Sequence, residues 1–144
     1  MENLVAEFDL GQENYNVLYN IAVQKSMIGD HEQAITILKF LVINAIDERG
    51  KYMKALAGCF HHQSELSGAI HFYLMSYFID PVLNVDCLLY TADCLMKQNR
   101  FHEVVDTLDI LFTATANQDD AKFIAKAKML HRIATNKIQS FSGI

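Results

Sequence analysis

The chain has 144 residues and a formal net charge of −5, with twelve lysines and arginines against seventeen aspartates and glutamates. This balance argues against a nucleic-acid-binding protein, and the basic residues between 122 and 132 are better interpreted as a solvated helix face. No apolar stretch approaches the roughly 18 residues of a membrane span, and the N-terminus lacks a secretory-signal pattern. We therefore expect one cytoplasmic domain over residues 1–144, without direct membrane insertion.

The first predicted element is a short N-terminal segment, residues 1–14. It carries Leu4, Val5 and Phe8 at amphipathic spacing before Gly11. We expect this segment either to fold back on the first repeat or to form a homodimer contact with a second subunit. The sequence alone does not choose between them.

Three repeats follow, at residues 15–48, 50–83 and 85–118. In each, apolar residues recur at helical spacing on both sides of a short polar turn, which predicts an A-helix, a turn and a B-helix. In the first repeat, Asp30 is expected to cap the B-helix. In the second, Pro81 is expected to end the B-helix, because proline cannot extend an interior helical turn.

The repeats share one small residue at the start of each B-helix. Ala34, Ala69 and Val104 stand 35 positions apart. An interval in this range is typical of a stacked helical solenoid. A small side chain at this point lets the B-helix approach the A-helix closely.

A longer amphipathic helix is predicted over residues 119–140, after a turn at residues 117–120. It carries Phe123, Ala127 and Leu130 on one face. We expect it to act as a C-terminal capping helix, because the last repeat of a solenoid otherwise exposes its stacking face. The predicted fold is therefore all-α.

The cysteines fit a reducing compartment. Cys87 and Cys94 lie seven residues apart on one predicted helix, about 10 Å along its axis, which is too far for a disulfide bond. Cys59 belongs to another helix. We expect all three to be buried thiols that pack as small hydrophobic side chains.

The repeats resemble tetratricopeptide repeats when they begin at Tyr15, Gly50 and Val85. Small and apolar residues then fall where that family has them, and Pro81 stands where a proline is common. Lys25 in place of an aromatic residue and Thr91 in place of an apolar one are departures. The resemblance implies three helical hairpins in a short right-handed solenoid plus the capping helix.

Three A-helix stretches carry a narrower resemblance, to the class II chaperones of bacterial type III secretion. The stretches are Leu18-Tyr19-Asn20-Ile21-Ala22, Ala55-Leu56-Ala57-Gly58-Cys59 and Tyr90-Thr91-Ala92-Asp93-Cys94-Leu95. Those chaperones are small, acidic, cytosolic proteins with three such repeats and a final helix. Members that dimerise through an N-terminal extension have a longer leader than this chain. The resemblance implies a client that is a hydrophobic translocator or an effector.

The tetratricopeptide resemblance also implies which side chains line the concave groove. The predicted peptide-binding residues are Tyr19, Asn20, Val23, Ser26, Met27, Lys54, Gly58, His61, Leu89, Tyr90, Asp93 and Met96. Tyrosine and methionine offer adaptable apolar contact, and a glycine leaves room for a ligand. Such a groove suits an extended segment with a few apolar anchors, although Val23 and Leu89 are about equally well interpreted as core.

Domains that bind the acidic tail of a heat-shock chaperone are a different class. They present lysine and asparagine on the first A-helix, where this chain has Tyr19 and Val23. The carboxylate clamp is therefore absent from the sequence.

The adjacent histidines His61 and His62 could also indicate a metal site. Adjacent histidines in a helix point about 100° apart, whereas helical zinc pairs are four residues apart. We find no glycine-rich phosphate loop, nucleophile elbow or paired carboxylates either. We expect no metal, no cofactor and no catalytic residue, and hence a binding protein rather than an enzyme.

The leading hypothesis is a type III secretion chaperone that binds an extended apolar segment of a secreted translocator or effector. It would keep that client soluble and competent for export. One alternative is a tetratricopeptide adaptor or co-chaperone for a needle subunit or another component of the secretion apparatus, which would bind an amphipathic helix. Another is a protein that sequesters a regulator in the same groove.

Overall fold

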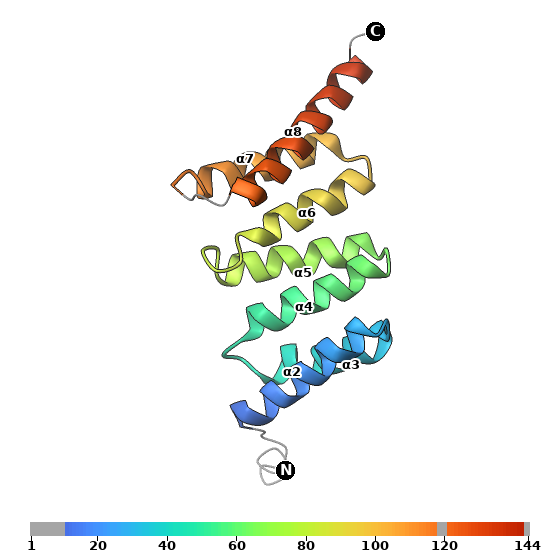
Figure 1. Ribbon diagram of the computed structural model, residues 1–144, viewed down its shortest axis with the longest axis vertical. Coiled ribbons are helices and arrows are strands. Elements are labelled where there is room, and N and C mark those ends of the chain that lie inside the picture. The colour runs from blue at the N-terminus through green and yellow to red at the C-terminus, as the bar shows by residue number, and fades with distance from the viewer. Residues whose placement is uncertain (1–10, 118–120, 143–144) are drawn as a thin grey trace.

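The computed structural model describes residues 11–117 and 121–142, which form a stacked array of helices (Figure 1). Leu4, Val5 and Phe8 of the predicted N-terminal segment, and residues 118–120 of the predicted turn, lie outside the described residues. The helices of the described part are α2 (Gln12–Met27), α3 (His31–Asn44), α4 (Arg49–His62), α5 (Leu66–Ile79), α6 (Asp86–Lys97), α7 (Phe101–Ala114) and α8 (Ala121–Ser142).

The helices pack as successive hairpins. The pairs are α2 with α3, α4 with α5 and α6 with α7, while α8 packs against α7 and α6 (Figure 1). Each hairpin stacks on the next along the long axis, so that α2 and α8 lie at opposite ends. The prediction of an all-α, tetratricopeptide-type solenoid is confirmed. Helix α2 begins at Gln12, ahead of the first repeat expected at Tyr15.

Small residues at fixed repeat positions form the contacts within each hairpin. Ala34, Ala69 and Val104 are all 0% exposed, as expected for close approach of the A- and B-helices. The A-helices carry a second series at the same interval of 35 residues, in which every member is buried: Ala22, Ala57, Ala92 and Ala127. The last of these belongs to α8, so the capping helix continues the A-helix pattern.

The capping role of α8 follows from its outer face. Leu56 of α4 and Thr91 of α6 stand at one repeat position, and each is 1% exposed. At the equivalent position α8 has the exposed Lys126. Its inner face packs through Ala127 and Leu130 on the core that α6 and α7 form. The terminal helix thus exposes a charged residue where the inner helices bury an uncharged one.

Each A-helix ends in the same left-handed turn. The residue in this conformation is Gly29 (φ 87°), Ser64 (φ 61°) or Asn99 (φ 58°), again 35 positions apart. The backbone N–H that follows it donates to the carbonyl five residues earlier, at 2.8, 2.9 and 3.0 Å in the three repeats. This is the Schellman arrangement that closes a helix C-terminus. The polar turns predicted from the sequence therefore have one common geometry.

Replacing Ser64 by glycine is expected to stabilise the protein by about 1 kcal/mol, because only glycine adopts this backbone conformation without a steric cost. Asparagine tolerates the left-handed region better than serine, so Asn99→Gly should have a smaller effect. Urea unfolding of the two variants measures the difference. A Ser64→Gly variant no more stable than the parent would contradict this interpretation of the turn.

The other local predictions are also met. The Asp30 side chain accepts a hydrogen bond from the backbone N–H of Gln33 and so caps α3. Helix α5 ends at Ile79, two residues before Pro81. The three cysteines are free and buried, and burial raises the pKa of both Cys87 and Cys94 to about 11. They are therefore uncharged packing residues.

Candidate peptide-binding groove

Polar side chains connect neighbouring A-helices at one sequence separation, 32 residues. The Nζ atom of Lys54 on α4 lies 2.5 Å from Oδ2 of Asp86 on α6. About two turns further along α4, Nε2 of His61 lies 3.0 Å from Oδ2 of Asp93. This separation is three residues, or about one helical turn, shorter than the repeat of 35 residues. Each side chain on α4 therefore faces a residue of α6 that lies one turn before its own repeat equivalent. These pairs hold α4 and α6 in register along the groove.

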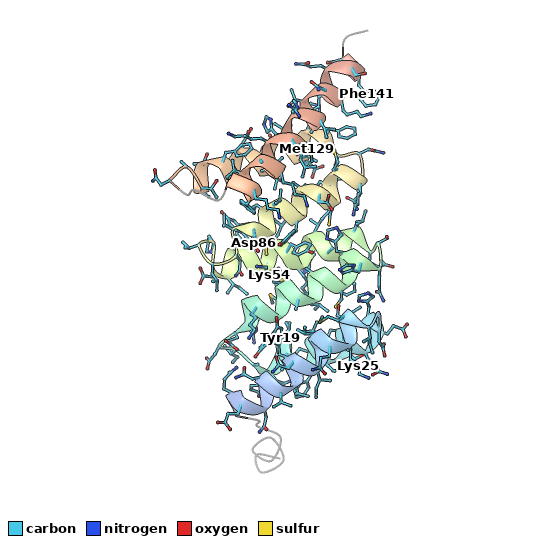
Figure 2. All side chains as sticks on the ribbon, in the orientation of Figure 1. Tyr19, Lys25, Lys54, Asp86, Met129 and Phe141 are labelled. Atoms are coloured by element: carbon cyan, nitrogen blue, oxygen red, sulfur yellow. The ribbon has the colours of Figure 1, made fainter. Side chains whose placement is uncertain are left out.

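The Lys54–Asp86 pair forms a charged link that is partly shielded from water (Figure 2). Burial lowers the pKa of Lys54, but the hydrogen bond and charge of Asp86 outweigh it, so the pKa is raised overall. Lys54 therefore remains charged at neutral pH. Because its charge is already matched by Asp86, the groove at this point offers little free positive charge to an acidic tail.

His61 is the centre of a second polar cluster. Burial, aided by the charge of Lys97, lowers the pKa of His61, so the imidazole is neutral at pH 7. A carboxylate only accepts, so Nε2–H donates to Asp93, and Nδ1 accepts from the Tyr73 hydroxyl at 3.0 Å. Lys97 completes the cluster 3.3 Å from Asp93. Burial raises the pKa of Tyr73, so its hydroxyl acts here as a hydrogen-bond donor and not as a nucleophile.

Protonation of His61 is expected to weaken the fold. Its pKa is lower in the folded chain than the ordinary 6.5, so the unfolded state binds more protons as the pH falls through 6.5. The contribution of His61 to stability is thus present above that pH and is lost below it. Unfolding free energies measured from about pH 7.5 to about pH 5 should fall less steeply in His61→Gln than in the parent. Parallel curves would contradict this assignment.

An apolar hollow lies between α2 and α4. Its volume is 190 Å³, and the lining residues are Ala22, Val23, Ser26, Met27, Leu38, Ala55, Gly58, Cys59 and His62. Gly58 is open to this space, since a Cβ atom added there would meet no atom within 4 Å. Met27 at the rim is 80% exposed. The hollow can therefore take an apolar side chain without displacing any core residue.

A second cavity, of 470 Å³, shares Ala55 with the first. It is lined by Tyr19, Lys51, Lys54, Ala55, Leu83 and Asn84. The Lys51 ammonium lies 4.2 Å from the centre of the Tyr19 ring, a cation–π contact that orients the tyrosine. Figure 2 shows Tyr19 on α2 and Lys54 on α4 along this surface. The two cavities together form an interrupted groove along α4, which we call the trough.

The structure places the predicted groove residues in different surroundings. Tyr19, Val23, Ser26, Met27, Lys54 and Gly58 line the two cavities, and Asn20 is exposed beside them on α2. His61 and Asp93 form the polar cluster. Tyr90 is half-buried against the Tyr73 ring, with centroids 5.3 Å apart.

Leu89 is a correction to the predicted set. It is only 4% exposed and belongs to the core formed by α6, α7 and α8. Met96 packs against the same core and is partly buried. Both lie on α6, against which α8 packs, so they join the core at positions that the resemblance predicts to face the groove. We therefore assign Leu89 to the core.

Sequence reasoning did not identify Leu83 and Asn84 as groove residues, because they belong to the loop before α6 and not to an A-helix. Asn84 is 3% exposed and donates to the carbonyl of Ser76 at 3.0 Å, which holds the loop in place. The partners of Lys54 and His61 could have been predicted from the sequence, because an aspartate follows each of them after 32 residues. No sequence signal singled out Tyr73 as the partner of His61.

Two further properties concern the described residues alone. Within residues 11–117 and 121–142, no helix has the length and apolar character needed to cross a membrane. In the same ranges, no group of three histidine, cysteine, aspartate or glutamate side chains is placed to hold a metal ion.

Comparison with solved structures identifies the fold. The translocator chaperone SycD of Yersinia enterocolitica superposes with a TM-score of 0.81 at 16% identity, over 94% of this chain and 93% of SycD. The same chaperone in complex with a peptide of the translocator YopD gives 0.78 at 19% identity, over 88% and 96%. This chain has the fold of the type III secretion translocator chaperones. The resemblance drawn from the three A-helix stretches is confirmed at the level of the fold.

The fold also occurs outside secretion. The TPR2AB domain of yeast Sti1, solved in a complex with pHSP90, matches with a TM-score of 0.78 at 15% identity, over 93% of this chain and 51% of that one. No family model and no curated protein sequence matches the chain. The side chains of the groove, and not the fold alone, must therefore distinguish the functions.

Proposed function

We propose that this protein is a type III secretion chaperone that binds an extended apolar segment of a secreted translocator or effector in the trough along α4. It acts in the bacterial cytoplasm and keeps its client soluble until export. The observation that carries this proposal is the apolar hollow at Gly58, open to solvent and lined by α2 and α4. SycD, which was solved with a translocator peptide, supports it through a shared fold.

The chemistry of the trough favours an apolar segment over a charged tail. Val23 and Met27 flank the hollow, and both lysines of the second cavity already have partners. Lys54 is paired with Asp86, and Lys51 lies over the Tyr19 ring and 3.8 Å from Glu48. Burial of one leucine-sized anchor there would contribute about 1.5–3 kcal/mol. A few such anchors suffice for a reversible complex once the cost of ordering the segment is included. A chaperone must release its client, so moderate affinity suits the role.

The experiment that tests this function is capture of the tagged protein from its own bacterium, followed by mass spectrometry of the bound proteins. The expected partner is a secreted protein with a long apolar stretch, and a synthetic peptide from that stretch should bind the purified chaperone. Recovery of a needle subunit would instead favour the adaptor alternative. Recovery of a transcription regulator would favour sequestration.

A further inference from the structure

Helix α8 has a charge unlike that of the rest of the chain. Five of the twelve lysines and arginines lie in α8 and none of the seventeen acidic residues does, so the remainder carries a net charge of −10. The five are Lys122, Lys126, Lys128, Arg132 and Lys137, and all are exposed. Among the described residues none of them is in an ion pair. The basic residues of α8 can therefore attract an acidic ligand to this helix of an otherwise acidic protein.

A third cavity lies at the C-terminal part of this helix. Its volume is 740 Å³, and it is formed between the start of α7 and the end of α8. The floor is apolar: the rings of Phe101 and Phe141 stack with centroids 6.3 Å apart, beside Ile138. Lys137 and His102 stand among the lining residues. Phe141 is nevertheless 70% exposed, so the aromatic floor is open to a ligand.

This cavity is separate from the trough along α4. Figure 1 shows the end of α8 extending past α7, and Figure 2 places Phe141 near that end, far from Tyr19 and Lys54. No residue lines both surfaces. The cavity therefore constitutes a second binding surface at the far end of the solenoid.

We propose that the cavity between α7 and α8 is a second docking site, which takes an acidic peptide segment with one aromatic or aliphatic anchor from a partner protein. The anchor packs on Phe101 and Phe141, and the acidic residues of the segment face Lys137 at the C-terminal end of α8. This occupant is favoured because the unpaired basic residues of α8 attract acidic residues, and the apolar cavity at the end of the helix accepts the anchor. The site does not depend on the function proposed for the trough.

A membrane surface and a nucleic acid fit the same helix less well. A helix that lies on a membrane needs a continuous free apolar face. In α8, Ala127, Leu130 and Ala134 are buried against α6 and α7, and among its described side chains only Met129, Ile133 and Phe141 are exposed large apolar residues. A nucleic acid is long enough to extend beyond α8, where the net charge of −10 on the remaining chain would repel it. A short acidic segment with an apolar anchor uses both the charge and the cavity.

The test is fluorescence anisotropy of the full chain with a fluorescein-labelled peptide of glutamate and alanine carrying a single central phenylalanine. We expect saturable binding that Lys137→Glu and Phe141→Ala each weaken by about tenfold or more. Lys122→Glu is the matched control. It makes the same change in net charge on the same helix but lies about 22 Å away, beyond the screening length of about 8 Å. Its affinity should stay within about twofold of the parent.

Other results would overturn the proposal. These are a lack of saturable binding, equal losses for Lys137→Glu and Lys122→Glu, or undiminished binding of a peptide with serine in place of phenylalanine. Loss of binding in Gly58→Leu would place the peptide in the trough. Binding to phosphatidylserine vesicles or to single-stranded DNA that Lys137→Glu abolishes would identify a different ligand. A dimer in analytical ultracentrifugation that Lys137→Glu dissociates would identify a second copy as the occupant. Circular dichroism of each variant verifies that the fold is retained.

Discussion

Replacing Gly58 by leucine is expected to weaken client binding strongly while leaving the fold slightly more stable. The glycine lies inside α4, where a larger residue improves helix propensity by about 0.5–1 kcal/mol. A Cβ atom at this position meets nothing within 4 Å, so the new side chain projects into the hollow and fills it. An apolar anchor of the client then has no space, and the affinity should fall by about ten- to a hundredfold.

Gly58→Ala is the matched control for this prediction. It gives the same gain in helix propensity but adds only one methyl group to the 190 Å³ hollow. Binding of the client peptide, measured by calorimetry, should stay close to that of the parent, while both variants unfold at a higher urea concentration. If Gly58→Leu binds the client as tightly as the parent, the hollow is not the anchor site.

Replacing Ala69 by leucine is expected to lower the free energy of unfolding by about 1–3 kcal/mol. Ala69 is 0% exposed and packs in a core with Ala57 and Tyr73. Three additional carbon atoms cannot be accommodated between α4 and α5 without moving one helix away from the other. The displaced helices also carry Gly58 and His61, so a weaker client affinity should accompany the loss of stability.

The control is His71→Leu, an exposed position on the same helix. This change introduces the same side chain into α5 without entering the core, so urea unfolding should show a change of at most about 0.5 kcal/mol. Equal destabilisation by both substitutions would mean that α5 does not pack closely against α4 at Ala69.

The fold was predictable because its contacts recur with the repeat. Ala34, Ala69 and Val104 are buried at one repeat position, because the two helices of each hairpin contact each other in the same way. The turns at Ser64 and Asn99 follow the same rule, with equal backbone geometry despite different side chains. Local patterns of this kind need only helical periodicity and a constant interval.

The groove was less predictable because it depends on how the hairpins lie relative to one another. The separation of 32 residues between Lys54 and Asp86 reflects the tilt between successive A-helices, which no single repeat encodes. Leu89 is buried because α8 continues the array over the third repeat, and Leu83 reaches the trough from a loop. These features arise from tertiary arrangement, so a list of concave positions could not supply them.

The most direct test of the trough as the client site is site-specific photocrosslinking. Benzoylphenylalanine is placed at Val23, which lines the hollow, or at the exposed Lys39 on α3 as a control outside it. After illumination in the source bacterium, the Val23 variant should form a crosslink to the apolar stretch of a secreted protein, and Gly58→Leu should remove that product. Crosslinking of the client at Lys39 and not at Val23 would contradict the account.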